Sequence, residues 1–210
     1  MLMAARVMNT TFGIDLYWLP IGAGGTGFVR LNGEIYEAIM AWVKGRKRCH
    51  LYHSGLVVSA PEGHYTIEQT PAGRDPEVRG VVSTGPIGAV WLARRVPIFN
   101  YELRRWRDGT IPDIEEAVDS PRHLSSSPAD AQRLLELVPA VPTLIWGRDE
   151  LHAGEMWNSN SQIAWLLART GVGVDSITPP PGGRAPGWHA GLVAAAMPDH
   201  RVTVHEIQPA

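Results

Sequence analysis

The chain has 210 residues, of which 44% are hydrophobic and 19% charged, and its formal net charge at pH 7 is −2. This length and composition suit a single globular domain, residues 1–210, that can bury a full core. The small negative charge argues against nucleic acid or an anionic membrane as the main partner. The one cysteine, Cys49, excludes an internal disulfide and a cysteine-based metal cluster. We therefore expect no cofactor and no metal.

Neither end of the chain predicts a targeting signal or a membrane span. The stretch from Met1 to Met8 lacks the sequence of basic region, long apolar run and small-residue cleavage site that marks a secretory signal. The apolar run from Ala190 to Met197 is far shorter than the 18 or so residues that a membrane helix needs. We expect a soluble cytoplasmic protein without an integral membrane segment. The sequence leaves its oligomeric state open.

The first predicted strand covers Ile14–Ile21 and leads into a glycine-rich stretch, residues 22–27, that matches G-x-G-x-x-G. A dinucleotide-binding fold would need a helix at the third glycine and an acidic residue about 20 positions later. Gly33 would interrupt that helix, and no Asp or Glu occurs between Glu37 and Glu62. We therefore interpret residues 22–27 as a loop or hairpin near an active site.

The clearest β-hairpin joins Leu51–Val58 to His64–Thr70. With a two- or four-residue loop, the numbers of paired residues sum to 123, so Gly55 faces Glu68. His53 and Glu68 are then diagonal neighbours on one face, whereas a three-residue loop would put them on opposite faces. A carboxylate beside a histidine favours the imidazolium and fixes the tautomer, as a general base needs. The alternative is a surface hairpin with unrelated polar residues.

Four small polar residues, Asn158 to Ser161, directly precede an apolar segment with helical spacing. Such residues cap a helix by accepting hydrogen bonds from its first N–H groups. The same helix start concentrates positive partial charge, which can lower the pKa of a nucleophile or hold an anion. Only one of the four residues is needed to cap the helix. We assign Asn158 to capping. Asn160 can cap the helix or orient a neighbouring group, and Ser161 is the candidate nucleophile.

The remaining expectations concern secondary structure and one arginine. We expect a helix over 34–43, extended segments over 78–82 and 97–101, a short acidic helix over 115–118, a helix over 129–138, a rigid proline- and glycine-rich loop over 178–188 and a last strand over 202–207. Arg184, within that loop, is a candidate contact to an anionic group of a substrate. The alternative is an exposed arginine without such a role.

The segments His53–Val58, Thr66–Glu68 and the helix after Asn160-Ser161 together resemble the permuted papain-like amidases, relatives of the NlpC-type cell-wall peptidases and of lecithin retinol acyltransferase. The resemblance implies an α+β protein with a circularly permuted papain-like fold, in which an antiparallel β-sheet or partial barrel packs against helices. It implies a Ser161-His53-Glu68 triad, with serine at the position where the family carries its cysteine nucleophile. The chain also resembles a group of bacterial proteins that share Trp-Asn-Ser-Asn-Ser and Ala-Pro-Gly-Trp segments, which implies no particular activity.

The family resemblance implies a hydrolase or acyl transferase that acts on an amide, ester or thioester bond of a small-molecule, lipid or peptide substrate. Backbone N–H groups at the helix start would form the oxyanion hole. The candidate substrate-binding or oxyanion residues are Asn160, Asn158, Tyr52 and Arg184. Two alternatives stay open. One is a catalytically inactive papain-like pseudoenzyme that binds a small ligand or peptide, and the other is an unrelated fold in which Asn158 to Ser161 only cap a helix.

Overall fold

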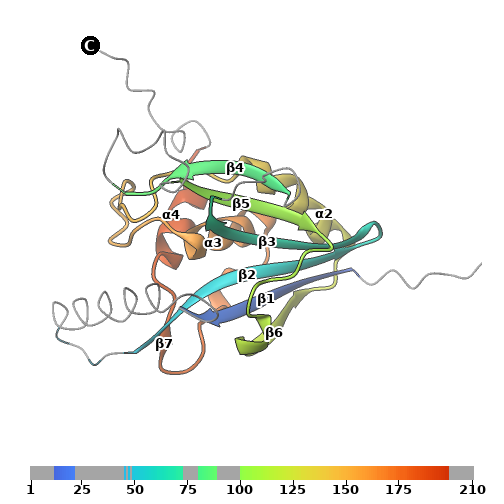
Figure 1. Cartoon of the computed structure of the whole chain (residues 1–210), viewed down its shortest axis with the longest axis horizontal. Coiled ribbons are helices and arrows are strands. Elements are labelled where there is room, and N and C mark those ends of the chain that lie inside the picture. Colours follow the sequence, from blue (N-terminus) through green and yellow to red (C-terminus); the bar gives the residue numbers. More distant parts are fainter. Residues whose placement is uncertain are drawn as a thin grey trace, which may run out of the picture.

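The structure is a computed structural model that describes residues 12–21, 45, 47, 49–72, 80–88 and 100–198. As expected, these residues form an α+β protein with a sheet packed against helices (Figure 1); the sheet has seven strands and the helices are three. The strands are β1 (Gly13–Pro20), β2 (His50–Ala60), β3 (Gly63–Pro71), β4 (Val81–Pro86), β5 (Asn100–Arg107), β6 (Val118–Ser125) and β7 (Gly183–Arg184). The helices are α2 (Pro128–Leu137), α3 (Ser159–Thr170) and α4 (Trp188–Ala196), with 3₁₀ turns at Ile114–Glu116, Val138–Ala140 and Val174–Ser176.

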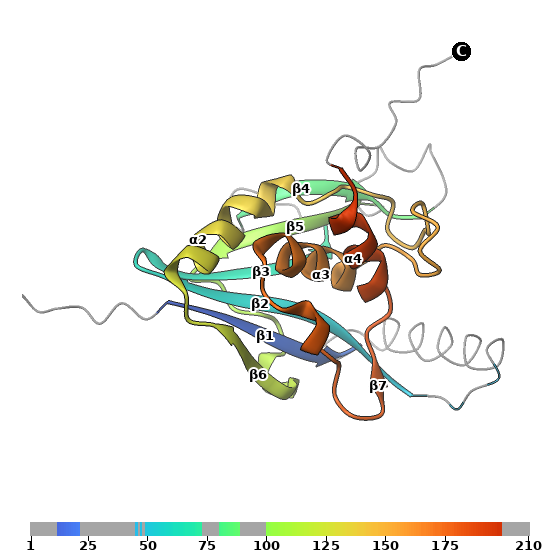
Figure 2. The ribbon, with the colours of Figure 1, turned by 180° about the vertical axis from the view of Figure 1, so that it is seen from behind.

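Six of the strands follow the order β4-β5-β3-β2-β1-β6, and each pairs antiparallel with its neighbours. The two-residue strand β7 adds to the start of β2 in parallel orientation. All three helices cover the same face of this sheet (Figure 2). The central strands β2 and β3 therefore have a helix-covered face and a second face that points away from the helices.

The predicted hairpin is confirmed, and its register is the one expected for an even-numbered loop. Ala60 pairs with Gly63 and Leu56 with Ile67, so the paired numbers sum to 123 and the turn has two residues. The pairing of β2 with β3 extends from the turn to this Leu56–Ile67 pair, and on its other edge β3 pairs with β5 from Tyr65 to Pro71.

The main core lies between the helices and the even-numbered residues of β2. Tyr52, Leu56 and Val58 belong to one buried cluster with apolar residues of α2 and α3, such as Leu134 and Leu166. Successive side chains of a strand point to opposite faces, so these residues define the helix-covered face. Burying each large apolar side chain contributes about 1.5–3 kcal/mol, which makes this layer the main source of stability.

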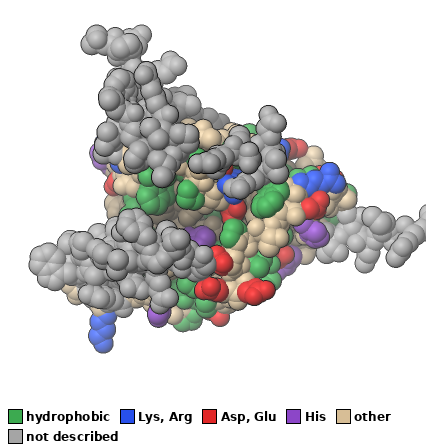
Figure 3. Space-filling view, viewed as in Figure 1, with side chains coloured by type: hydrophobic (Ala, Val, Ile, Leu, Met, Phe, Trp, Pro, Cys, Tyr) green, Lys and Arg blue, Asp and Glu red, His purple; other side chains and the backbone are tan. Residues whose placement is uncertain are grey.

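The second face of the sheet is also covered, in part by the segment 108–117. A Cβ on Gly55 would lie 3.2 Å from Cδ1 of Ile111, which is itself buried. Leu19 of β1 is buried as well and pairs with His53 across the strands. Figure 3 shows the molecule from this side, where acidic and histidine side chains lie among apolar ones. Both faces of β2 are therefore largely buried.

Some of the local elements match expectation and others differ from it. The helix predicted over 129–138 is confirmed as α2, with Ser127 Oγ capping the N–H of Asp130. The acidic segment 115–118 is a 3₁₀ turn followed by strand β6, which was not predicted. The rigid loop ends at Gly187, because α4 begins at Trp188 and covers most of the apolar run 190–197. The predictions for 22–27, 34–43 and 202–207 lie outside the described residues.

Two further expectations concern the family fold and the membrane. Over the described residues, none of the helices has the length and apolar character required to span a bilayer. The finer expectation of a circularly permuted papain-like arrangement stays a prediction.

Candidate functional site

The start of α3 is built as a reciprocal cap. Asn158 Oδ1 accepts hydrogen bonds from the backbone N–H groups of Asn160 (2.9 Å) and Ser161 (3.3 Å), and Ser161 Oγ accepts one from the N–H of Asn158 (3.0 Å). This capping box satisfies backbone donors that a helix start otherwise leaves free. The N–H groups of Asn160 and Ser161, which the family resemblance assigns to an oxyanion hole, are therefore already bonded within the protein.

The hydroxyl group of Ser161 is buried, and its proton is hydrogen-bonded within the protein. The residue is 0% exposed, and its Oγ donates to the carbonyl oxygen of Gly187 at 2.8 Å, with the carbonyl of Met156 at 3.4 Å. Since the same oxygen also accepts from Asn158, it makes both the donor and the acceptor bond that a buried hydroxyl needs. In this state Ser161 is a structural group that joins the start of α3 to the start of α4.

Asn160 lies at the meeting point of three segments. Its Oδ1 accepts from Ser54 Oγ at 2.8 Å, and its Nδ2 donates to the carbonyl oxygens of Tyr52 and Pro186, each at 2.9 Å. Asn160 is 1% exposed, so these hydrogen bonds are shielded from water, and losing any of them would leave a buried polar group without a partner. The residues that face the helix start from β2 are thus Ser54, through its side chain, and Tyr52, through its carbonyl.

His53 points to the other face of the sheet. Ser54 faces α3, so strand alternation directs the neighbouring His53 toward the side covered by residues 108–117. The side chain is partly buried, and burial lowers the pKa of His53 to about 4, although the carboxylate of Asp113 acts in the opposite direction. At neutral pH this imidazole is uncharged, and the sheet separates it from Ser161.

Glu68 belongs to a buried charged cluster on the same face as His53. Arg104 pairs with Glu68 across the strands, with Nη1 3.6 Å from Oε1, and its Nη2 lies 2.9 Å from Oε2 of Glu102. All three residues are buried. Burial raises the pKa of Glu68, and the Arg104 guanidinium opposes this shift. The carboxylate of Glu68 is held by this arginine, so it has a structural partner other than His53.

The structure therefore separates the predicted residues into two groups. Asn158, Asn160, Ser161 and the carbonyl of Tyr52 lie together at the start of α3, whereas His53 and Glu68 lie across the sheet. The expected hydrogen-bonded triad is not formed in this arrangement, because a neighbouring residue, not the predicted one, faces the helix from β2.

Arg184 serves the loop that leads into α4. Its Nη2 lies 3.7 Å from Oε1 of Glu155, whose other oxygen accepts hydrogen bonds from the N–H groups of Gly187 (2.9 Å) and His189 (3.2 Å). The arginine thus supports a carboxylate that caps α4. This bonding accounts for its position without an anionic ligand.

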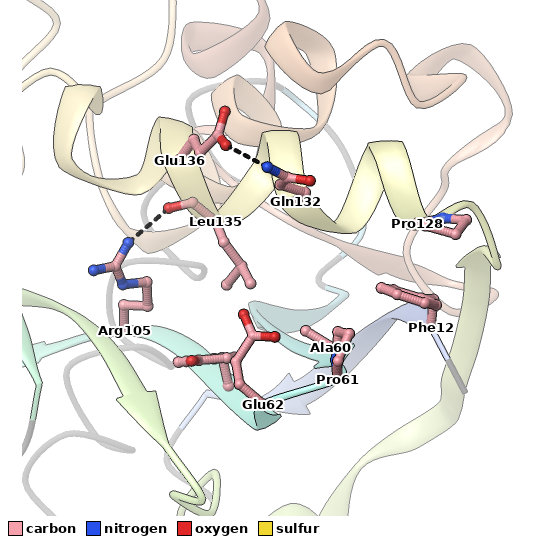
Figure 4. Close-up of a pocket in the computed structure, with 10 residues that line it drawn as sticks. Phe12, Ala60, Pro61, Glu62, Arg105, Pro128, Gln132, Leu135 and Glu136 are labelled. Carbon is pink, nitrogen blue, oxygen red and sulfur yellow. Dashed lines mark hydrogen bonds between the residues drawn. The ribbon is translucent and has the colours of Figure 1, made fainter. Parts of the chain in front are cut away.

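An open cleft lies between the β2–β3 turn and α2 (Figure 4). Its volume is about 530 Å³, which falls within the range of small-molecule sites. The apolar lining comes from Phe12, Ala60, Pro61, Tyr65, Pro128 and Leu135, and the polar lining from Glu62, Arg105, Gln132 and Glu136. No pattern in the sequence predicts this cleft. The polar turn residue Glu62 and the exposed face of α2 were visible in the sequence, but nothing there indicated that they meet.

Neither a metal site among the described residues nor a known relative identifies the chemistry of this protein. In the part of the chain that the structure describes, no three His, Cys, Asp or Glu side chains are grouped closely enough to hold a metal ion. Searches against protein-family models, curated proteins and solved structures find no match to this chain.

Proposed function

We propose that the protein is a binding protein for a small ligand or peptide, built on a permuted papain-like scaffold whose helix start no longer carries a nucleophile. The observation that carries this proposal is the bonding of Ser161: its hydroxyl is fully buried and donates to the carbonyl of Gly187. A serine nucleophile must instead give its proton to an adjacent base and be reachable by a substrate.

The contact between β2 and α3 supports the same conclusion. In the family, a histidine on the strand meets the nucleophile at the helix start. Here Ser54 and Asn160 meet at 2.8 Å, and neither a neutral hydroxyl nor an amide can act as the base of such a pair. The pair instead ties the strand to the helix. The cleft beside α2 is the site that we assign to the ligand.

A fluorophosphonate probe tests the loss of the nucleophile. We expect no labelling of the folded wild-type protein, with a known serine hydrolase as positive control and Ser161→Ala as the matched blank. Labelling of the wild type that is lost in Ser161→Ala would overturn the proposal, because it would require an exposed and activated Ser161 hydroxyl.

A cysteine variant adds a readout of site geometry. In folded Ser161→Cys we expect slow reaction with a thiol reagent, because the side chain is buried, and no change in that rate when His53→Ala is added. Rapid alkylation that depends on His53 would show that the imidazole reaches residue 161 and would contradict the proposal. The native Cys49 supplies a second thiol in the same chain, so reaction at each position is assigned by peptide mapping.

A further inference from the structure

The cleft between the β2–β3 turn and α2 has an apolar end and an acidic part. Phe12 and Pro128 lie together at one end of it (Figure 4). In the figure the carboxylate of Glu62 points from the turn into the cleft toward Leu135, whereas that of Glu136 lies on the side of α2 away from Glu62, beside Gln132. An occupant that fills this space would touch a hydrophobic surface and the carboxylate of Glu62, with Glu136 at the rim.

The two carboxylates are exposed and unpaired with a cation. Glu136 accepts a hydrogen bond from Gln132 Nε2 at 2.9 Å, which is an uncharged donor. Neither Glu62 nor Glu136 forms an ion pair with any described residue. Their negative charge is therefore available to a ligand.

Among the described residues that line the cleft, the one cation is Arg105, and it is directed at the protein itself. Its Nη1 donates to the carbonyl oxygen of Leu135 at 2.9 Å. That carbonyl belongs to the last turn of α2, where the helix dipole concentrates negative partial charge and favours a cation. Arg105 thus stabilises the end of α2, and its positive charge offsets one of the two carboxylates, so that the charged residues of the lining keep a net charge of −1.

We infer that this cleft binds a small organic cation with an apolar body, such as an aromatic amine. The inference rests on the proposed binding function and names the class of ligand. The ammonium group would lie near Glu62, with the negative charge of Glu136 at the rim on α2, and the hydrocarbon part would cover the apolar lining toward Phe12. Partial exclusion of water by the walls strengthens such a charge contact compared with open solvent. An anion with the same body would instead be repelled.

Three matched probes test the inference: phenethylammonium, 2-phenylethanol and 3-phenylpropionate share a phenyl group and differ in charge. Each is titrated into the full-length ¹⁵N-labelled protein at constant ionic strength while backbone amide shifts are recorded. We expect saturable shifts at Glu62, Tyr65 and Gln132 with the ammonium probe. The alcohol should bind at least several-fold more weakly, and the carboxylate weakest of all.

Charge-neutralising variants assign the binding energy. Glu62→Gln and Glu136→Gln should each weaken phenethylammonium binding about two- to five-fold, as expected for one partly exposed charge contact. Glu115→Gln, an exposed acid in the 3₁₀ turn at Ile114–Glu116, is the control and should leave the affinity unchanged.

The outcomes separate the inference from the proposed function. Equal binding of the three probes, stronger binding of the carboxylate, or shifts confined to residues outside the cleft would overturn the ligand class. None of these results would produce probe labelling at Ser161, which is the result that overturns the proposed function.

Discussion

Replacing His53 with glutamine should remove a large part of the acid sensitivity of the fold. Burial lowers the pKa of His53 to about 4 in the folded protein, against 6.5 for a free histidine. Between these values the unfolded chain takes up a proton that the folded protein does not, so stability falls as the pH falls through this window. One pKa unit corresponds to about 1.4 kcal/mol, which gives a loss of about 2.5 kcal/mol at pH 4.5 relative to pH 7.5. This value is an upper limit because the side chain is partly exposed.

Urea denaturation followed by tryptophan fluorescence at pH 7.5 and pH 4.5 measures the effect. From pH 7.5 to pH 4.5, the free energy of unfolding should decrease by roughly 1–2.5 kcal/mol less in His53→Gln than in the wild type, since glutamine does not titrate. His152→Gln, at an exposed position, is the matched control for replacing a histidine. The same pH dependence in His53→Gln and in the wild type would refute the reasoning, and so would a wild type that becomes more stable as the pH falls.

Three further substitutions test the packing around the two faces of the sheet, each by urea denaturation. Asn160→Ala should cost about 3 kcal/mol because it removes hydrogen bonds to three buried groups, and a loss below about 1 kcal/mol would contradict the junction described above. Arg104→Met should cost about 3–5 kcal/mol at pH 7 by removing the cation beside two buried carboxylates, and less at pH 4.5, because burial raises the pKa of Glu68 and favours its neutral form; the exposed Arg107→Met is the control, and a pH-independent loss would argue against the ion pair with Glu68. Gly191→Ala should cost about 1–3 kcal/mol because its Cβ would meet the carbonyl of Ser161 where α3 and α4 approach closely, and an unchanged midpoint would show that the helices can separate.

The hairpin was predictable because its register depends on local signals. The turn residues and the two flanking strands restrict the pairing to a few registers, and the observed sum of 123 is the one expected for a two- or four-residue loop. The start of α3 was predictable for the same reason, since Asn158 and Ser161 cap it through neighbouring backbone groups.

The face of the hairpin that meets the helix was not predictable from the sequence. A strand with one buried face shows alternating hydrophobic and polar residues, which identifies the side that packs on the core. In β2 both Leu51 and Tyr52 are buried, as are both Gly55 and Leu56, so this alternation is missing. His53 and Ser54 were therefore equivalent candidates for the helix-facing position, and only the packed structure distinguishes them.

The missed elements have similar physical reasons. β6 is an edge strand that contains Pro121 and alternates between exposed and partly buried residues, which weakens its pattern. α4 begins directly after a proline- and glycine-rich segment, and its N-cap residue, Gly187, has no side chain that could cap it. Glu155 supplies the cap from a loop more than 30 residues earlier, and such a distant partner leaves no local signal.

The strand order also has a consequence for how the chain emerges during synthesis. β1 pairs on one side with β2, which soon follows it, and on the other side with β6, about 100 residues later. Until residues 118–125 leave the ribosome, β1 is an open edge whose free backbone groups can pair with another nascent chain. We therefore expect the partly synthesised chain to be open to misassembly at this edge over about half of its translation.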